Sequence, residues 1–188
     1  MNYYQFLKNS IRHIRTTGTI TRSSRTTCKM MIRNVDFDKG RYFVELGGGD
    51  GVMTRYILRA MHPDAKLMTF EINPDFIRAL HKIDDPRLIV ISDQAQKLPH
   101  YLNEHHFPHA DAIISSLPLL VIPSDERTAI VEACRESLRP GGTFSQIHYS
   151  PALKNFYGYI FGNVEMKFVL LNLPPAFIMY CQKSNEHV

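Results

Sequence analysis

The sequence contains few cysteines and no long hydrophobic run. Its three cysteines, Cys28, Cys134 and Cys181, form an odd set without C-x-x-C spacing, which favours a reducing compartment over a disulfide framework. The first residues lack the continuous apolar stretch of a secretory signal. The most apolar window, residues 112–123, contains two prolines and is too short to span a bilayer. These absences predict a cytoplasmic protein that does not cross a membrane, and 44% apolar with 21% charged residues predicts one soluble globular domain.

Acidic residues are absent from the first 35 positions, whereas the rest of the chain has more acidic than basic residues. The asymmetry predicts a basic N-terminal arm, residues 1–35, on a mildly acidic domain, residues 36–188. Such an arm points to an anionic partner, either nucleic acid or lipid head groups. The basic residues of the arm are Lys8, Arg12, Arg15, Arg22, Arg25, Lys29 and Arg33.

The start of the arm has the pattern of a basic amphipathic helix. On a helix, one apolar stripe is flanked by polar and basic side chains, the stripe being Tyr3, Leu7, Ile11 and Ile14 and the flank Gln5, Lys8, Arg12 and Arg15. Such a helix can lie in a membrane interface, and it would then associate peripherally with the inner face of the membrane. It can equally pack its stripe on the domain beside a cofactor cleft, and the two interpretations are compatible.

After the arm, short apolar runs alternate with stretches of helical period, which predicts a parallel sheet covered by helices on both faces. The expected strands are Tyr42–Leu46, Lys66–Glu71, Leu88–Ile91, Ala112–Ser115 and Thr143–His148. The expected helices are Val52–Met61, Pro74–Lys82, Gln94–Glu104 and Ser124–Leu138.

The C-terminus breaks this alternation. The β-rich runs "VEMKFVLLN" and "AFIMYCQK" are joined only by Leu173, Pro174 and Pro175. So short a connection cannot hold a parallel crossover, so the pair is expected to be an antiparallel hairpin.

The segment "YFVELGGGDGVMTRY" has the pattern of a strand, a glycine turn and a helix, and its glycines leave room for a ligand close to the backbone. No lysine follows Gly51, which excludes a P-loop, and the G-x-G-x-G spacing differs from the dinucleotide fingerprint G-x-G-x-x-G. Glu45, two residues before the first glycine, suits a cationic amino-acid or sulfonium ligand better than a pyrophosphate. Glu71, which ends the second strand, is expected to accept hydrogen bonds from ribose hydroxyls.

Four motifs in order, "ELGGGDG", "FEINP", "SDQA" and "LRPGGTF", resemble the signatures of class I S-adenosylmethionine-dependent methyltransferases. The resemblance implies a Rossmann-like α/β fold with a seven-stranded sheet whose last strand is antiparallel. It also implies S-adenosylmethionine as cofactor and S-adenosylhomocysteine as product. The residues that it assigns to the cofactor are Glu45, Gly47, Gly48, Gly49 and Gly51 for methionine, Glu71 for ribose, and Ile72 and Asp93 for adenine, with Gln94 and Ser115 beside them. Asp93 has the alternative of being a solvated acid at a strand end.

The segment "SSLPLL", residues 115–120, leaves the fourth strand where the transferred methyl is expected. Base N-methyltransferases resemble it in shape but carry an Asn or Asp for the base amine and an aromatic that stacks on a flipped base. Ser116 and Leu119 occupy those positions, which counts against a base substrate. Together with the arm, "TGTITRSSRTTCKMM", "LRPGGTFSQIHYS" and "NLPPAFIMYC", the segment resembles bacterial phospholipid N-methyltransferases, which methylate phosphatidylethanolamine stepwise.

This second resemblance suggests the substrate site. Tyr149 is the first candidate for contacting the amine, with Ser116 beside the transferred methyl, and its ring could face the developing quaternary ammonium. Leu117 and Tyr157 are expected near the lipid, Tyr157 having a core role as its alternative. Ser23 and Ser24 are expected to close over the cofactor carboxylate, and Arg22 or Arg25 to reach the lipid phosphate.

Two further interpretations remain open: an RNA or DNA N-methyltransferase whose arm tracks phosphates, and a non-catalytic cofactor-binding protein at the membrane. The loop with His105, His106 and His109 is expected to be solvated rather than a metal site, because no cysteine or further acid stands at ligand spacing. The oligomeric state is left open.

Overall fold

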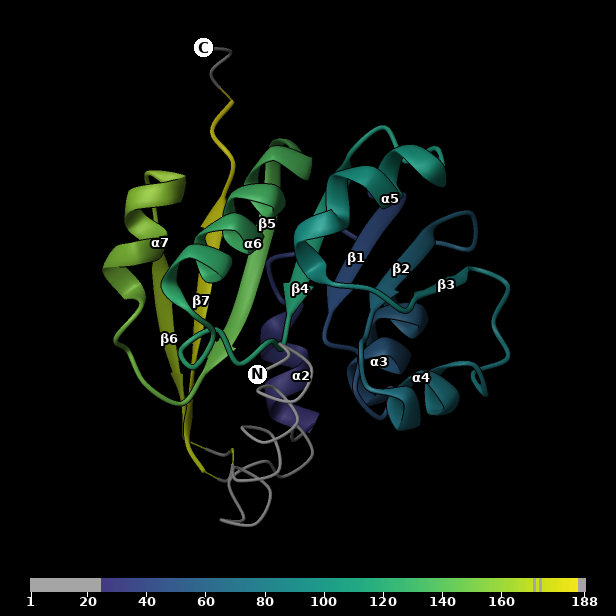
Figure 1. Cartoon of the computed structure of the whole chain (residues 1–188), viewed down its shortest axis with the longest axis horizontal. Helices are drawn as coiled ribbons and strands as arrows, with labels where there is room; N and C mark the ends of the chain where they lie inside the picture. Colours follow the sequence, from purple (N-terminus) through teal and green to yellow (C-terminus); the bar gives the residue numbers. More distant parts are fainter. Residues whose placement is uncertain (1–24, 171, 173, 186–188) are drawn as a thin grey trace.

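The computed structural model describes residues 25–170, 172 and 174–185. Their seven strands form one sheet in the order β3-β2-β1-β4-β5-β7-β6 (Figure 1). The strands β1 to β5 are parallel, and β7 is antiparallel to both β5 and β6. The predicted seven-stranded, mostly parallel sheet with a C-terminal antiparallel hairpin is thus confirmed. The strands are β1 (Tyr42–Leu46), β2 (Lys66–Phe70), β3 (Leu88–Ile91), β4 (Ala110–Ser115), β5 (Leu138–His148), β6 (Glu165–Val169) and β7 (Ala176–Gln182).

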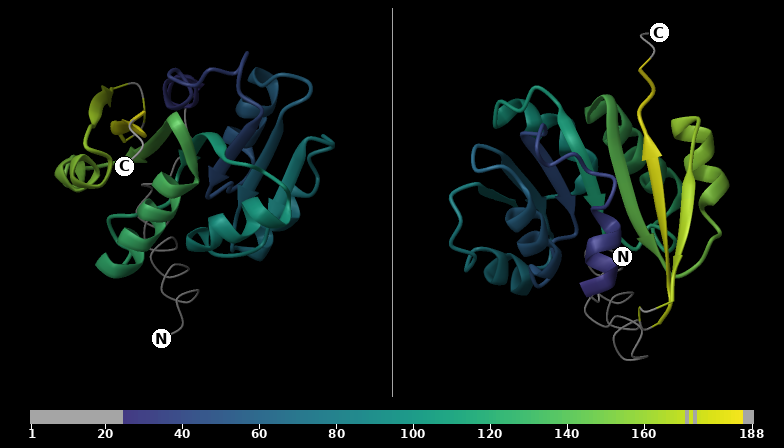
Figure 2. Two further views of the ribbon diagram at one scale, coloured as in Figure 1. Left: turned by 90° about the horizontal axis from the view of Figure 1, so that it is seen from above. Right: turned by 180° about the vertical axis from the view of Figure 1, so that it is seen from behind.

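The helices cover both faces of the sheet, with α2 and α6 on opposite sides in Figure 2. The helices α2, α3 and α4 lie on one face, and α5, α6 and α7 lie on the other. Their bounds are α2 (Arg25–Met31), α3 (Val52–Ala60), α4 (Pro74–Leu80), α5 (Leu98–Glu104), α6 (Ser124–Ser137) and α7 (Lys154–Phe161), with a short 3-10 turn, η1 (Ala95–Lys97), before α5.

Alternation along the strands divides the core in two. Val44, Ile113 and Phe144 face α5, α6 and α7, whereas Phe43 and Ile114 face α2 and α3. Because the central strands are buried on both faces, their residues are mostly apolar, and polar residues within them, such as Glu45, Thr69 and Gln146, are buried as well. The three cysteines are buried as thiols within these two layers.

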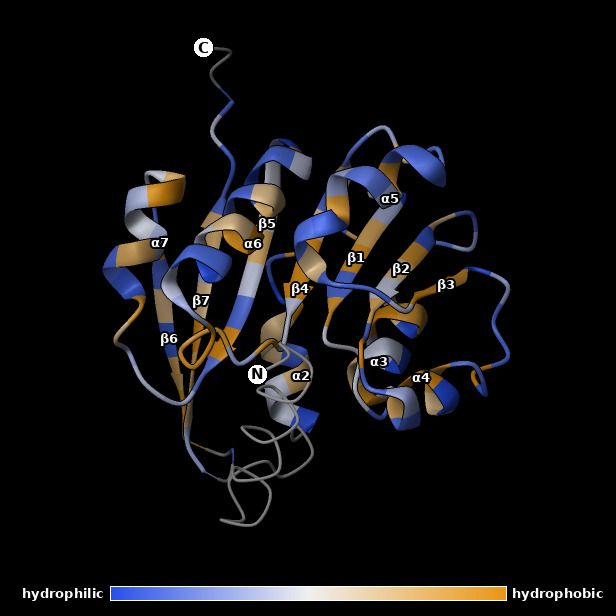
Figure 3. Cartoon of the chain, in the orientation of Figure 1, coloured by the Kyte–Doolittle hydropathy of each residue, from blue (hydrophilic) through white to orange (hydrophobic). Residues whose placement is uncertain are grey.

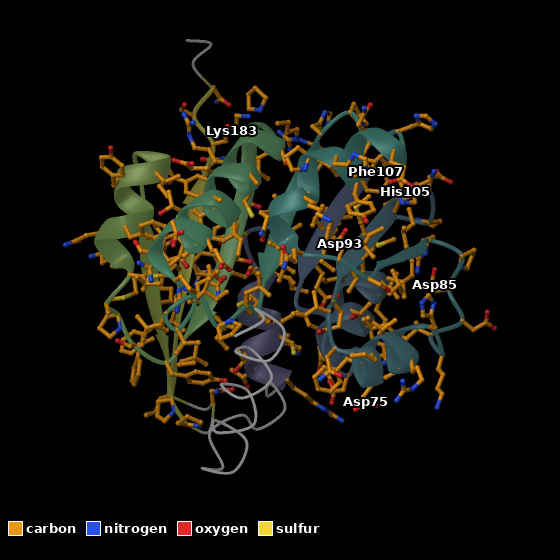
Figure 4. The ribbon with its side chains drawn as sticks, viewed as in Figure 1. Asp75, Asp85, Asp93, His105, Phe107 and Lys183 are labelled. Carbon is orange, nitrogen blue, oxygen red and sulfur yellow. The ribbon has the colours of Figure 1, made fainter. Side chains whose placement is uncertain are left out.

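The carboxyl ends of β1, β2, β4 and β5 meet at one edge of the sheet, here called the carboxyl edge. The strand β6 also ends there, because it is parallel to β5 through their shared partner β7. Figure 4 shows the opposite direction of β7: Lys183, which follows it, lies at the far end of the molecule from Asp75, which follows β2. Loops at the carboxyl ends of parallel strands are where ligands bind in open α/β sheets.

Some elements differ from those expected. The expected helix 94–104 is divided into η1 and α5, because Pro99 lacks the N–H that a continuous helix needs and stands instead at the start of α5. Strand β5 begins at Leu138, five residues earlier than expected, because Leu138 pairs with Ala110 before a register shift in β4. Helix α7 was not expected at all.

Helix α2 is packed into the domain although it belongs to the arm in sequence. Cys28 and Met31 are buried against the α3 side of the sheet. Thr27 Oγ1 donates a hydrogen bond to Asn172 Oδ1 at 2.7 Å, and the Tyr180 hydroxyl donates to the Met30 carbonyl. No helix among the described residues is long and apolar enough to cross a membrane.

Candidate active site

The glycine turn joins β1 to α3 at the carboxyl edge. Gly47, Gly49 and Gly51 have φ of 79°, 54° and 80°, a region that favours glycine. The N–H groups of Gly47 and Gly48 donate to the Phe70 carbonyl at 2.9 and 3.1 Å, and the N–H of Gly51 donates to the Gly48 carbonyl at 3.0 Å. These amides are therefore committed to the fold, and the turn does not present them as a phosphate cradle does.

Glu71 closes the turn from the neighbouring strand. Its Oε2 accepts the Gly49 N–H at 2.9 Å, and its Oε1 accepts the N–H groups of Ile72 and Asn73, each at 2.9 Å. Oε2 thereby keeps a second lone pair for a ligand hydroxyl. Ile72 is half-buried and packs at the border of the core.

Glu45 lies fully buried beneath the turn on the α3 side of the sheet. Its Oε2 accepts hydrogen bonds from Thr54 Oγ1 at 2.7 Å and Thr69 Oγ1 at 2.9 Å, while its Oε1 is buried and has no hydrogen-bond partner among the described residues. Burial raises the pKa of Glu45 to about 7, although the two threonine hydroxyls oppose the shift. A buried acceptor without a donor is costly, so this oxygen is a natural point of attachment for a cationic or N–H-bearing ligand.

Asp93 and its neighbours form the third part of the site, just after β3 (Figure 4). The Asp93 carboxylate accepts hydrogen bonds from Lys97 Nζ at 2.9 Å, the Tyr101 hydroxyl at 2.8 Å and the Gln94 N–H at 2.7 Å. Burial alone would raise the pKa of Asp93, but these donors, Lys97 foremost, hold it below the ordinary value. The carboxylate is therefore fixed in place and ionised at neutral pH.

The end of β4 is held by a residue that was not among the predicted ones, Gln146 of β5. Gln146 is fully buried in register with Ser115, and its Nε2 donates to the carbonyls of Leu117 at 2.9 Å and Ile147 at 2.7 Å. Two carbonyls can only accept, so the amide nitrogen must face them. Its Oε1 is buried and has no hydrogen-bond partner within the described part of the chain. Strand alternation in "SQIHYS" predicts that Gln146 lies on the same face of the sheet as Phe144, but it does not predict the contact with Leu117.

Serines and Leu117 form the exit from β4. Ser115 is fully buried, and the Ser116 N–H donates to the Leu46 carbonyl at 2.8 Å. Leu117 approaches the glycine turn, since a Cβ placed on Gly47 would lie 3.2 Å from Leu117 Cδ2. The predicted residues of the β1 turn and the β4 end are thus side by side.

Tyr149 lies immediately after β5 and is 41% exposed. Burial of part of the phenol raises its pKa, and a hydrogen bond with Asn172 opposes the shift. Because Asn172 also accepts from Thr27 of α2, Tyr149, the β6–β7 connection and α2 meet at one point of the carboxyl edge.

Tyr157 lies in the core rather than at the surface. It is fully buried, and its hydroxyl is 2.7 Å from Nε2 of His148. Burial lowers the pKa of His148 to about 4, with a contribution from the positive charge of Arg127, so the imidazole is neutral at pH 7. Burial also raises the pKa of Tyr157.

Several predicted residues lie outside the described part of the chain. These are Lys8, Arg12, Arg15, Arg22, Ser23 and Ser24. Arg25, the first described residue, is exposed at the start of α2. Within the described ranges, no group of three or more His, Cys, Asp or Glu residues could hold a metal ion.

Comparison with known proteins places the chain in a family. A family model described as a methyltransferase domain matches residues 44–144, which begin within β1 and include the glycine turn, β2 to β4 and β5 as far as Phe144. The ornithine lipid N-methyltransferase of Singulisphaera acidiphila is 29% identical over an alignment of 188 residues. The alignment covers 98% of each chain.

Solved structures share the fold at low sequence identity. The N-methyltransferase NodS from Bradyrhizobium japonicum WM9, in complex with S-adenosyl-L-homocysteine, is similar with a TM-score of 0.64 and 12% identity, over 85% of this chain and 86% of that one. Spermidine synthase from Thermotoga maritima is similar with a TM-score of 0.63 and 19% identity, over 85% of this chain but only 59% of the synthase. The chain belongs to the methyltransferase domain family and has the class I fold of S-adenosylmethionine-dependent methyltransferases.

Proposed function

We propose that this protein transfers methyl groups from S-adenosylmethionine to the amine of a membrane lipid. The observation that carries the proposal is the similarity to an ornithine lipid N-methyltransferase, which extends over 98% of both chains and so includes the substrate-binding parts as well as the cofactor motifs. The sequence points to phosphatidylethanolamine as the acceptor, and the relative acts on an ornithine lipid by its name. An amine on a lipid head group is common to both.

The exit from β4 supports a lipid rather than a nucleobase. Leu119, which stands where base methyltransferases carry their stacking aromatic, is fully buried. It therefore offers no surface on which a flipped base could stack. Ser116 in place of Asn or Asp also lacks the carbonyl oxygen that would accept a hydrogen bond from a base amine.

The residues of the carboxyl edge fit S-adenosylmethionine. A side chain placed on Gly49 would meet nothing within 4 Å, so open space borders the turn where the ligand is expected. Glu45 and the glycine turn would hold the methionine part, Glu71 the ribose, and Ile72, Asp93 and Gln94 the adenine, with Ser115 beside them. When bound, this cofactor supplies a methyl group on a sulfonium.

The acceptor must reach the site as a neutral amine, since an alkylammonium with a pKa of about 10 has no lone pair for the methyl group. We assign Tyr149 to the amine. Its raised pKa keeps the phenol neutral at pH 7, so it serves to position the amine rather than as a phenolate base, and its partial exposure lets the released proton pass to water. Alignment beside Ser116 and Leu117 and exclusion of water then supply the rate.

The arm is assigned to the membrane and to closure of the site. Lys8, Arg12 and Arg15 would attract anionic lipid, each contributing about 1 kcal/mol. Ser23 and Ser24 would reach the cofactor carboxylate, and Arg22 or Arg25 the lipid phosphate. In this proposal the protein is bound peripherally to the inner face of the membrane.

The experiment offers S-adenosylmethionine with a labelled methyl group to the full-length protein with three acceptors in parallel: phosphatidylethanolamine vesicles, ornithine-lipid vesicles and RNA. Label in either lipid supports the proposal, and the stronger of the two identifies the head group. Label in RNA alone would contradict it. Cofactor binding without transfer to any acceptor would instead favour a non-catalytic protein. The variants Tyr149→Ala and Tyr159→Ala provide a matched pair, since only the first removes an aromatic from the carboxyl edge.

A further inference from the structure

Large apolar side chains are exposed at the carboxyl edge on two segments far apart in sequence. Leu120 and Val121 are 47% and 38% exposed, and Phe168 and Leu170 are 56% and 69% exposed. We call these four residues the apolar rim. Single exposed apolar residues are ordinary on a protein surface, whereas apolar residues gathered on one face mark an interaction site.

The first segment of the rim follows strand β4. Leu120 and Val121 lie in the connection from β4 to α6, which is coloured as largely hydrophobic in Figure 3. The connection is fixed rather than loose: Leu119 and Ile122 on either side are buried in the core, and the Val121 N–H donates to the Pro118 carbonyl at 3.0 Å. The fold thus holds two apolar side chains outward next to the predicted methyl-transfer position.

The second segment is the end of β6, at the same edge. Phe168 lies opposite Phe177, with ring centroids 5.1 Å apart, and Phe177 lies opposite His148, the residue before Tyr149. Leu170 follows directly after β6. The two segments therefore flank the end of β5, where Tyr149 is placed.

We propose that the apolar rim inserts into the interface of a lipid bilayer and sets the carboxyl edge against the membrane. The inference rests on the proposed lipid acceptor: the head-group amine must reach Tyr149 while the acyl chains stay in the bilayer, which requires the surface around Tyr149 to face the membrane. Apolar side chains at that edge gain free energy by leaving water, and they would lie at the depth of the head-group and acyl-chain boundary.

The charge at this edge also suits a lipid surface. Arg25 and Lys29 are exposed on α2, whose start lies beside Asn172 of the β6–β7 connection. The residues before Arg25 include four basic and no acidic side chains, and α2, which follows them in sequence, begins at this same edge. Basic residues beside an apolar surface are typical of peripheral binding to membranes that contain anionic lipid.

The chain has no tryptophan, so a single introduced tryptophan reports its own surroundings. The full-length variants Leu120→Trp and Phe168→Trp test the two segments of the rim, and Tyr159→Trp is the matched control, since Tyr159 is 90% exposed on α7. The probe is a vesicle of phosphatidylethanolamine and phosphatidylglycerol, with and without brominated acyl chains. We expect a blue shift and bromine quenching at positions 120 and 168 and neither at 159. Unchanged fluorescence at both rim positions would overturn the proposal.

Vesicle flotation of Leu120→Asp/Val121→Asp and Phe168→Asp/Leu170→Asp measures the contribution of each segment. We expect each pair to weaken binding about tenfold or more, because a charge must enter the apolar interface, and Tyr159→Asp to leave binding unchanged. The loss should persist in high salt, which screens the arm but not the rim. Thermal unfolding verifies that the variants fold. Flotation of these variants at the level of the parent protein would contradict the proposal. So would the finding that, without vesicles, a second copy of the chain or residues 1–24 cover the rim. Vesicle binding is measured without cofactor and therefore does not depend on methyl transfer. A failure to methylate lipid would refute the proposed activity without deciding whether the rim binds the membrane.

Discussion

Glu71 Oε2 accepts the backbone N–H of Gly49 at 2.9 Å, which ties the end of β2 to the glycine turn after β1. The bond fixes two parts of the predicted cofactor site against each other before any ligand binds. Because the other oxygen of Glu71 accepts two further N–H groups, the carboxylate is oriented by three donors. Preorganisation of this kind lowers the entropic cost of binding.

Glu71→Gln should weaken S-adenosylmethionine binding. The amide replaces one acceptor oxygen by a donor nitrogen, so the turn loses part of its support and the ribose hydroxyls lose a charged acceptor, and a hydrogen bond to a charged group contributes about 1.5–3 kcal/mol. This corresponds to a Kd raised about tenfold or more in isothermal titration. The control is Asp75→Asn, since the Asp75 side chain is 78% exposed and pairs only with Arg78 among the described contacts. Equal affinities for both variants would exclude Glu71 from the cofactor site.

Glu45 should make stability depend on pH in the direction opposite to an ordinary surface acid. Its pKa is raised from 4.5 to about 7 in the folded protein, so between these values the folded state binds more protons than the unfolded state. Stability relative to Glu45→Gln should therefore fall as pH rises from about 4.5 to 7, by about 3 kcal/mol at most. Urea unfolding of both proteins at several pH values measures their free energies of unfolding. A parent protein that becomes more stable relative to Glu45→Gln as pH rises would contradict the raised pKa of Glu45.

Gln146 should support methyl transfer without binding the cofactor. Gln146→Leu removes the two donors that hold the carbonyls of Leu117 and Ile147, which costs about 1–3 kcal/mol of stability for buried carbonyls left unpaired. We expect a kcat lowered about tenfold or more through misplacement of the β4 exit, with the cofactor Kd unchanged. Gln182→Leu is the comparison, since the Gln182 amide also donates to a backbone carbonyl, that of Gly141, but lies at the opposite end of the sheet. An unaltered kcat would show that the hydrogen bond to Leu117 does not position the site.

Thr27 and Asn172 should be energetically coupled. Their side chains join α2 to the β6–β7 connection over 145 residues of sequence. A double-mutant cycle with Thr27→Val and Asn172→Ala should give a coupling of about 1 kcal/mol in chemical unfolding. Additive effects would mean that this hydrogen bond does not help to hold α2, and that the Tyr180–Met30 hydrogen bond and the buried Cys28 and Met31 anchor it instead.

The sequence predicts the frame of this fold better than its cross-links. Strands β1 and β3 have the expected bounds because their apolar runs end at a glycine turn or a polar residue. The hairpin was predicted from a short connection with two prolines, although β6 ends at Val169, so the connection has six residues rather than three. Helix α7 was not predicted, because the residues of "KNFYGYIF" are mostly apolar and show no clear polar face. Only the packing of the helix on β7 separates its inner face from its outer face. The roles of Gln146 and Asn172 depend on contacts between distant elements, which periodicity does not encode.

The position of the added methyl group tests lipid N-methylation most directly. The full-length protein is incubated with S-adenosylmethionine and vesicles that contain the amine lipid, and the extracted lipid is analysed by tandem mass spectrometry. We expect methyl groups on the head-group nitrogen, and about tenfold fewer when Glu71→Gln is assayed at cofactor concentrations well below its Kd. Unmethylated lipid in the presence of bound cofactor, or methyl groups only on nucleic acid added to the same reaction, would contradict it.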